Sequence, residues 1–339
     1  MTGAGGPPDG DSGPETEELT LVAAVREALR GELDRDEDVV VVGEDVGRNG
    51  GVFRATEGLR EQFGEDRVID TPLAESAIVG TAVGMAVYGL RPVAEIQFSG
   101  FMYPAFDQLA SHAARFRNRS RGRFTCPLVV RAPYGGGIRA PEHHAESKEA
   151  LYAHEPGLTV VVPSTPRDAK GLLAAAVRHP DPVVFLEPKR IYRSLREAVP
   201  AGPYTEPIGE AAVRREGADV SVFTWGATTR PALEAAEELA GEVDAEVVDL
   251  RTLSPLDVET LVASFEKTGR AVVAHEAPRT GGFGAEVTAV LQERALVYQE
   301  APIVRVTGFD VPFPLYSLED DYLPNVARVR DGIREAVEF

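Results

Sequence analysis

The stretch Val68-Ile69-Asp70-Thr71-Pro72-Leu73-Ala74-Glu75-Ser76 joins a short apolar strand to a helix and puts one carboxylate, Glu75, at the start of that helix. The helix continues through small and apolar residues to Ala86, so Glu75 has few polar neighbours. Burial in such surroundings disfavours the charged form of a carboxylate, and a carboxylic acid that keeps its proton can donate it to a ring nitrogen. A second interpretation stays open, in which Glu75 only complements the positive end of the helix dipole.

Strands and helices alternate on both sides of this stretch, which predicts an α/β fold. Val39-Val40-Val41-Val42 is entirely apolar, as strands inside a parallel sheet tend to be. A helix is expected from Thr20, because apolar residues then recur on one face: Leu21, Val22, Val25, Leu29 and Leu33. Further strands are expected at 92–98, 128–131, 158–162 and 182–186, and helices at 75–88, 103–117 and 166–178. This pattern predicts a doubly wound parallel sheet.

The chain is expected to form two unlike α/β domains. Residues 1–18 are rich in glycine, proline and acidic side chains and are expected to be a disordered tail. Residues 19–196 make up the first domain, and the prolines and missing periodicity of 197–208 indicate a linker. The second domain, 209–339, is expected to have strands at 219–225, 245–250, 271–275 and 303–307, and helices at 229–241, 256–265, 284–296 and 323–337.

Composition excludes several classes of protein. The 339 residues carry a net charge of −19 and only four lysines, whereas nucleic-acid binding relies on basic patches. No apolar run is long enough to cross a membrane and no signal pattern precedes the first helix, so we expect a cytoplasmic protein without nucleic-acid or membrane partners. The acidic, lysine-poor composition suggests a high-salt cytoplasm, or alternatively a genome that prefers arginine codons. The single cysteine, Cys126, precedes an apolar strand and is expected to be a buried thiol.

Three loops carry further candidate residues. His144 follows Gly135-Gly136-Gly137 in a polar loop, where a histidine can reach a substrate. Phe101 follows a predicted strand at the sheet edge where α/β proteins place ligands, so stacking on a ligand competes with core packing. Gly281-Gly282-Phe283-Gly284 precedes a helix and fits a structural turn or an anion-binding turn, but its spacing is not that of a dinucleotide-binding motif.

Together these residues resemble the beta subunit of the thiamine-diphosphate-dependent 2-oxoacid dehydrogenases, the decarboxylating component of the pyruvate and branched-chain complexes. The resemblance extends from about Thr20 to the C-terminus. It is carried by Gly43-Glu44-Asp45-Val46, Gly50-Gly51-Val52-Phe53-Arg54, Thr71-Pro72-Leu73-Ala74-Glu75, Ala94-Glu95-Ile96-Gln97-Phe98, Pro104-Ala105-Phe106-Asp107-Gln108, His144-Ala145-Glu146-Ser147, Ala169-Lys170-Gly171-Leu172-Leu173 and Gly308-Phe309-Asp310-Val311-Pro312-Phe313-Pro314. Each motif is weak by itself, and their order along the chain makes the resemblance specific.

The resemblance implies a transketolase-like pyrimidine-binding domain followed by a transketolase C-terminal domain. It places Glu75 at the aminopyrimidine ring nitrogen of thiamine diphosphate, Leu73 and Gln97 along that ring, and Phe101 packed on it. It places His144 opposite the reacting carbon and the incoming lipoyl group. The implied reaction is oxidative decarboxylation of a 2-oxo acid, with Glu75 as a proton partner of the cofactor and His144 assisting acyl transfer to lipoamide.

The resemblance also implies partners. Thiamine enzymes hold the diphosphate through Mg²⁺ with a Gly-Asp-Gly motif followed by an asparagine, and the nearest string here, Asp9-Gly10-Asp11, falls in the expected tail. A separate alpha subunit is therefore expected to hold Mg²⁺ and complete the site, in an α2β2 heterotetramer docked on a lipoyl acyltransferase core. A structural K⁺, frequent in the family, would lie near Cys126, Leu128, Val129, Ala176, His179 and Asp181. His179 stands where an acidic residue is common.

The substrate stays open, with pyruvate and the branched-chain 2-oxo acids as alternatives. Val52-Phe53 and Thr71-Pro72-Leu73 match the branched-chain type slightly better. An acetoin dehydrogenase beta subunit would share nearly all of these motifs, whereas a transketolase-type half-enzyme would need more basic residues for sugar phosphates. A non-catalytic assembly subunit is the alternative from a different class.

Overall fold

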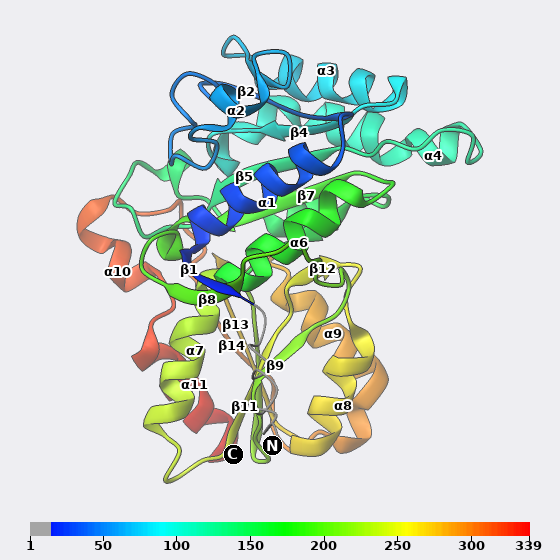
Figure 1. Cartoon of the computed structure of the whole chain (residues 1–339). Coiled ribbons are helices and arrows are strands. Elements are labelled where there is room, and N and C mark those ends of the chain that lie inside the picture. The colour runs from blue at the N-terminus through cyan, green and yellow to red at the C-terminus, as the bar shows by residue number, and fades with distance from the viewer. Residues whose placement is uncertain (1–14) are drawn as a thin grey trace, which may run out of the picture.

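The computed structural model describes residues 15–339 and confirms an α/β fold, with one domain stacked on the other (Figure 1). The first domain contains a seven-stranded sheet in the order β12-β6-β7-β5-β4-β2-β3. Its neighbouring strands are parallel except for β12 and β6. The strands are β2 (Val39–Gly43), β3 (Val68–Asp70), β4 (Arg91–Glu95), β5 (Val129–Tyr134), β6 (Thr159–Val161), β7 (Val183–Pro188) and β12 (Thr252–Ser254).

Helices cover both faces of this sheet. Helices α1 (Leu21–Arg35) and α6 (Pro166–Arg178) pack with Val39 and Val41 of β2 on one face. Helix α3 (Glu75–Tyr88) packs with Val40 and Val42 on the other, because successive side chains of a strand point to opposite faces. The five apolar residues predicted for one face of α1 are all buried. This helix begins where the Thr20 hydroxyl accepts a hydrogen bond from the amide of Ala23, at 3.3 Å.

The helix predicted at 103–117 is wrong. The segment consists of 3₁₀ turns at Ser99–Ala105 and Ala113–Arg115 around a π turn at Gln108–His112, and it ends in the short helix α4 (Phe116–Arg119). Pro104 lies inside the first turn and has no N–H to donate, which disfavours a regular α-helix there. The two other short helices of the first domain are α2 (Leu59–Phe63) and α5 (Glu149–Ala153).

The second domain contains a five-stranded sheet in the order β14-β13-β10-β11-β9, with only β9 antiparallel to its neighbour. Its strands are β9 (Ala212–Arg215), β10 (Val220–Thr224), β11 (Ala245–Asp249), β13 (Ala271–Pro278) and β14 (Val304–Gly308). Its helices are α7 (Thr229–Glu238), α8 (Val258–Thr268), α9 (Gly284–Ala295), α10 (Glu319–Tyr322) and α11 (Val326–Val337). Figure 1 shows α7 and α11 on one face of the sheet and α8 and α9 on the other.

The structure corrects two expected domain boundaries. The tail was expected to reach residue 18, but β1 (Thr16–Thr20) pairs in antiparallel register with β8 (Arg196–Pro200). The linker expected at 197–208 therefore begins with a strand. These two segments are far apart in the sequence and pair as strands with each other, so local pattern did not reveal them. Residues 1–14 of the expected tail lie outside the described residues.

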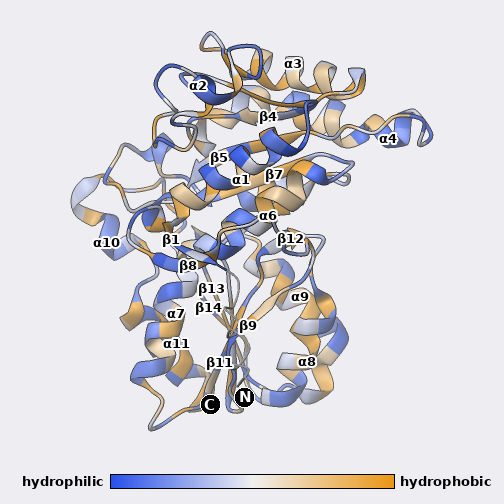
Figure 2. Ribbon diagram, in the orientation of Figure 1, coloured by the Kyte–Doolittle hydropathy of each residue, from blue (hydrophilic) through white to orange (hydrophobic). Residues whose placement is uncertain are grey.

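The two domains share one hydrophobic core. A continuous buried cluster contains Tyr134 of β5, Tyr152 of α5, Trp225 after β10, Leu253 of β12 and Phe283 before α9. Strand β12 also adds a segment of the second domain to the sheet of the first. Figure 2 shows α3 almost without a hydrophilic face, whereas α8 has one. Between residues 15 and 339 no helix is long and apolar enough to cross a membrane.

Candidate functional site

The candidate site lies at the carboxyl edge of the first sheet. Because β2, β3, β4 and β5 are parallel, the residues that follow them meet at this edge. They are Glu44 after β2, Thr71 after β3, Gln97 after β4 and Gly135 after β5. The chain pairs β2 with β3 on one side and with β4 on the other, so the order of strands reverses at β2. Such a reversal opens a crevice outside the strand ends, where open α/β sheets bind ligands.

Glu75 is the first residue of α3 and is half-buried. No side chain caps this helix, so the positive end of its dipole acts on the carboxylate. The pKa of Glu44 is raised by partial burial and then by the negative charges of Glu75 and Asp45, which shows that three carboxylates gather here. Within the described part of the chain, the Glu75 carboxylate accepts no hydrogen bond and forms no ion pair.

Leu73, Gln97 and Phe101 lie at the same edge with different exposures. Leu73 is 78% exposed, which is unusual for a leucine beside a half-buried carboxylate. The Nε2 of Gln97 donates to Oδ2 of Asp45 at 3.4 Å and so ties the end of β4 to the turn after β2. Phe101 packs its ring at 5.4 Å from the ring of Phe98 and stays partly exposed. The predicted residues therefore present an apolar and amide surface beside Glu75.

His144 lies in the loop after β5, in a 3₁₀ turn at Glu142–His144. Its ring meets the edges of Phe98 and Phe101, with centroids 4.6 Å and 5.1 Å away. The pKa of His144 is lowered by partial burial and then by the positive charges of His143 and Lys189, so the ring is neutral near pH 7. Its buried Nδ1 has no hydrogen-bond partner. The structure thus brings the rings of His144 and Phe101 together, a contact that the sequence did not predict, and leaves one ring nitrogen of His144 without a partner.

Sequence reasoning missed three residues around this site. Glu44 directly follows β2, so the sheet-edge argument applied to Phe101 could have found it. Phe98 supports the rings of both Phe101 and His144. Lys189 is 4% exposed and its Nζ lies 5.8 Å from the centre of the Phe98 ring, yet no local pattern marks it as part of the site.

The residues expected around K⁺ lie near one another but are already engaged. The amide of Leu128 donates to the Cys126 carbonyl at 2.8 Å, and the amide of Val183 donates to the Leu128 carbonyl at 2.8 Å. The Asp181 carboxylate pairs with Arg117 at 2.8 Å. Among the described residues no group of three or more His, Cys, Asp or Glu side chains is arranged to hold a metal ion. The K⁺ site stays a prediction.

Cys126 is buried, as expected, and burial raises the pKa of its thiol to about 12. A thiol that stays protonated is a poor nucleophile. The interpretation of Cys126 as a buried structural thiol fits this environment.

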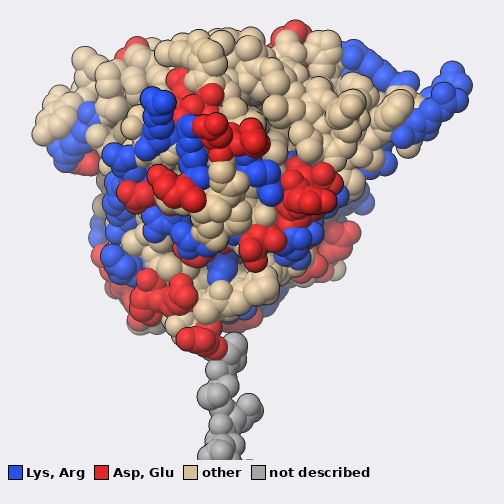
Figure 3. Space-filling model, turned by 45° about the horizontal axis from the view of Figure 1, so that its top comes forward, with Lys and Arg blue, Asp and Glu red and all other residues tan. Residues whose placement is uncertain are grey.

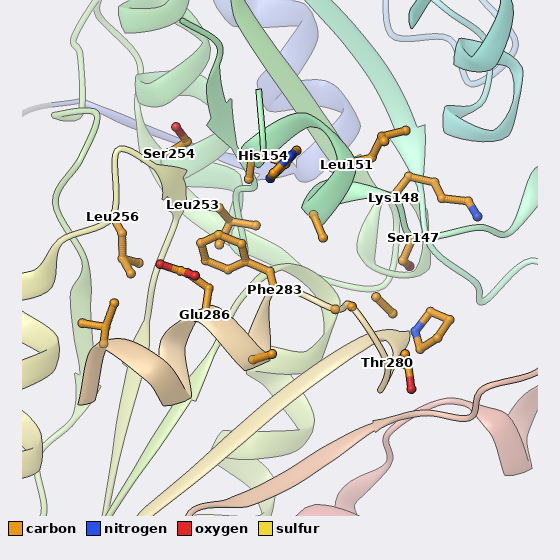
Figure 4. Close-up of a pocket in the computed structure, with 18 of the residues that line it drawn as sticks. Ser147, Lys148, Leu151, His154, Leu253, Ser254, Leu256, Thr280, Phe283 and Glu286 are labelled. Atoms are coloured by element: carbon orange, nitrogen blue, oxygen red, sulfur yellow. The ribbon is translucent and has the colours of Figure 1, made fainter. Parts of the chain in front are cut away.

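A separate cavity of about 880 Å³ lies between the two domains (Figure 4). Lys148 and His154 line one side of it, and Thr280, Phe283 and Glu286 line the other. None of the predicted site residues lines it. In the adjoining turn, a Cβ on Gly282 would lie 2.8 Å from Cε1 of the fully buried His275, and one on Gly284 would lie 2.6 Å from its Nε2. These close contacts support the structural-turn interpretation of Gly281–Gly284.

The surface around α3 differs from the rest of the molecule. Figure 3 shows an area over the top of the molecule that is largely free of charged side chains, with Lys and Arg gathered on the projecting α4 segment. Along α3 the exposed positions include Ala77, Thr81, Gly84 and Tyr88. These exposed positions of α3 carry no charge.

Comparisons with known proteins agree with this geometry. The family described as transketolase, pyrimidine binding domain, matches residues 17–194, and the transketolase, C-terminal domain, matches 209–329. The pyruvate dehydrogenase E1 component subunit beta of Bacillus subtilis is 53% identical over 323 residues, covering 95% of this chain and 99% of the relative. The protein of the same name from Staphylococcus aureus is 52% identical with the same coverage. These relatives give no support to the expected high-salt origin.

Solved structures show the same fold. A chain of a split-gene transketolase, described as an inactive beta4 tetramer, superposes with a TM-score of 0.76 at 25% identity, covering 96% of this chain and 99% of that one. Transketolase from Leishmania mexicana superposes with a TM-score of 0.72 at 17% identity over 96% of this chain and 46% of that one, which shows the fold alone. The chain therefore belongs to the family of thiamine-dependent 2-oxoacid dehydrogenase E1 beta subunits, in which a transketolase pyrimidine-binding domain precedes a transketolase C-terminal domain.

Proposed function

We propose that this chain, together with an alpha subunit, catalyses the oxidative decarboxylation of pyruvate and the transfer of the acetyl group to lipoamide. The names of the relatives at 52–53% identity favour pyruvate over the branched-chain acids and over acetoin. The structural support is Glu75, a half-buried carboxylate at a sheet edge with no partner of its own in the described chain. A carboxylate that only complemented a helix dipole would not need this position beside Leu73, Gln97 and Phe101.

The residues present fit thiamine diphosphate. The free carboxylate of Glu75 and the unpartnered Nδ1 of His144 leave two polar atoms for a bound group. When bound, the cofactor supplies the electron sink that decarboxylation of a 2-oxo acid requires. Glu75 would hold a proton at the aminopyrimidine ring nitrogen, while Leu73 and Phe101 pack against the ring. His144, neutral near pH 7, would give or accept a proton during acyl transfer.

An alpha subunit is proposed to complete the site. The sequence contains no Gly-Asp-Gly motif of the kind that holds the diphosphate through Mg²⁺, and the nearest string is Asp9-Gly10-Asp11. The uncharged open face of α3, which begins at Glu75, offers a surface on which a partner would cover the cofactor. We therefore propose an α2β2 heterotetramer in which the alpha subunit holds Mg²⁺, docked on a lipoyl acyltransferase core.

Replacement of Glu75 tests the proposal. Glu75→Ala should leave the heterotetramer assembled and abolish thiamine-dependent decarboxylation, because the proton partner of the cofactor is removed. Glu259→Ala is the matched control, since Glu259 is an exposed first-turn glutamate of α8 and changes only a helix-dipole contact. Near-normal decarboxylation by Glu75→Ala, or equal losses in the two variants, would contradict the assignment.

A binding experiment tests the shared site. Calorimetry should show negligible binding of thiamine diphosphate and Mg²⁺ to this chain alone, and binding once the alpha subunit is added. Tight binding to the chain alone would show that the site is not shared. Parallel assays with pyruvate and branched-chain 2-oxo acids then decide the substrate, and a kcat/KM that favours the branched-chain acids would refute the choice of pyruvate.

A further inference from the structure

The loop that carries His144 begins with three glycines packed tightly against other elements. Gly135 and Gly137 have φ of +76° and +98°, a backbone conformation that side chains other than glycine disfavour. A Cβ on Gly135 would collide with Glu276 of β13. A Cβ on Gly136 would lie 2.7 Å from Phe313, and one on Gly137 2.6 Å from Arg190. The start of the loop is therefore packed closely against residues of other elements and has no room for side chains at these three positions.

Two buried carboxylates of the second domain bind the start of this loop. Oε2 of Glu276 accepts a hydrogen bond from the amide of Gly136 at 3.2 Å, and Oε1 of Glu319 in α10 accepts one from the amide of Gly137. The two glutamates are 5% and 1% exposed. Hydrogen bonds from amides to a carboxylate are stronger than those between neutral groups, and stronger again away from water.

A buried lysine, Lys189, also binds the start of this loop. Nζ of Lys189 donates to the carbonyl of Gly135. Burial lowers the pKa of Lys189 to about 7, with the charges of Glu276 and Glu319 opposing the shift. The two carboxylates thus face a cationic or partly cationic group, which offsets part of the cost of burying them.

The other end of the loop is held by apolar contacts to the same domain. Ala145, directly after His144, is 1% exposed and forms a small hydrophobic cluster with Phe313, Tyr322 and Leu323. Glu319 lies in the same segment as Tyr322, in helix α10. The second domain therefore contacts the loop both before and after His144.

We propose that Glu276 and Glu319 are positioning residues for His144, acting through the amides of Gly136 and Gly137. This inference rests on the proposed role of His144 in acyl transfer. The carboxylates do not touch the reacting atoms. They fix the start of a loop whose catalytic side chain must keep its ring against Phe98 and Phe101 while a lipoyl group approaches. A displacement of a catalytic group by about 1 Å can cost about a hundredfold in rate.

Kinetics of the assembled enzyme test this proposal. Glu319→Ala should lower lipoyl acylation about tenfold, since a hydrogen bond to a charged group contributes roughly that factor. Decarboxylation measured with an artificial electron acceptor should change by less than about threefold. Glu319→Gln retains an acceptor oxygen for the Gly137 amide and should recover most of the loss, which also covers the case that the alanine variant folds poorly. Asp321→Asn, an exposed neighbour in α10, should have no effect.

A double-variant cycle separates positioning from general stabilisation. In a His144→Ala background, Glu319→Ala should cause no further loss of lipoyl acylation, because its effect passes through His144. Losses that multiply in the double variant, or equal losses in the two assays, would overturn the positioning role. If His144→Ala itself leaves lipoyl acylation unchanged, the proposed function of His144 has failed instead.

Hydrogen exchange gives a readout that does not depend on activity. In the assembled wild-type protein the peptide containing Gly136 and Gly137 should exchange slowly, and Glu319→Ala should accelerate exchange in that peptide without affecting the helix α1 peptides. Unchanged exchange in the peptide containing Gly136 and Gly137 would refute the proposal that Glu319 fixes this loop, even if Glu319→Ala had lowered the rate of lipoyl acylation.

Discussion

The buried ion triad at the centre of the first sheet allows a sharp stability prediction. Arg131 of β5 is 1% exposed and binds both oxygens of Glu187 in β7, through Nε at 2.6 Å and Nη2 at 2.7 Å. Its Nη1 also binds Glu95 of β4. Glu95 and Glu187 are 4% and 0% exposed, so one guanidinium compensates two carboxylates away from water.

Replacement of Arg131 by methionine keeps most of the side-chain volume and removes the only cation of the triad. Loss of one partner of a buried ion pair costs about 3–5 kcal/mol because it leaves an uncompensated buried charge. Here two carboxylates remain, so we expect Arg131→Met to lie at the upper end of that range. In the triple variant Arg131→Met, Glu95→Gln, Glu187→Gln the charges are gone together, and most of the loss should be recovered.

Urea unfolding of the full chain measures these differences, with fluorescence of Trp225 as the probe. Trp225 is the single tryptophan, is 1% exposed, and lies in the core shared by both domains. Burial raises the pKa of Glu95, so the deficit of Arg131→Met should shrink as the pH falls and this carboxylate takes up a proton. A deficit below about 1 kcal/mol, or a triple variant as unstable as the single one, would refute the reasoning.

Two further predictions concern a buried acid and a pair of glycines. Burial raises the pKa of Glu149 from 4.5 to about 7, so the folded state binds more protons than the unfolded state between these values and stability falls as pH rises through that window. The fall is on the order of 3 kcal/mol, and Glu149→Gln should remove it in urea titrations compared between pH 4 and pH 8. A Cβ on Gly100 would collide with the His143 carbonyl, so Gly100→Ala should displace the His144 loop and lower lipoyl acylation. Gly31→Ala, in the interior of α1 with open space around it, should instead raise stability by roughly 0.5–1 kcal/mol in the same urea assay and leave acylation unchanged.

Much of the fold could be predicted because the sheet is parallel and buried on both faces. Such strands have a continuous apolar sequence, and β2 is the clearest case, with all four of its valines buried. The amphipathic pattern of α1 was equally readable, since one face packs on α6 and the sheet. In both cases the local sequence and the tertiary environment favour the same structure.

The strands that could not be predicted from the sequence pair with strands far away in the chain. Strand β12 is three residues long and pairs with β6 across the domain boundary, so no window of sequence contains both strands. The same holds for β1 and β8. The segment 99–119 has the apolar content of a helix, but Pro104 and the contacts around Gly100 favour irregular 3₁₀ and π turns. Short irregular elements of this kind are specified by packing rather than by periodicity.

The candidate site likewise contains residues that the sequence predicted and residues that only the structure connects with it. Phe101 was placed at the carboxyl edge by the parallel-sheet argument, Glu75 was marked by its position at the start of a helix, and Gln97 was named through the family resemblance. Lys189, Glu276 and Glu319 come from three other elements, and no spacing in the sequence connects them with His144. The three glycines before His144 were visible in the sequence, but their close contacts with other chain segments appear only in the structure.

The proposed positioning of His144 would give the second domain a role beyond assembly. The edge that holds Glu75 is built by the first sheet alone, whereas the loop that holds His144 is fixed by β13, α10 and the segment around Phe313. Decarboxylation and acyl transfer would then depend on different parts of the chain. Disturbing the second domain near Glu319 should impair transfer while decarboxylation continues, and disturbing the start of α3 should stop both, because no acyl group is formed to be transferred.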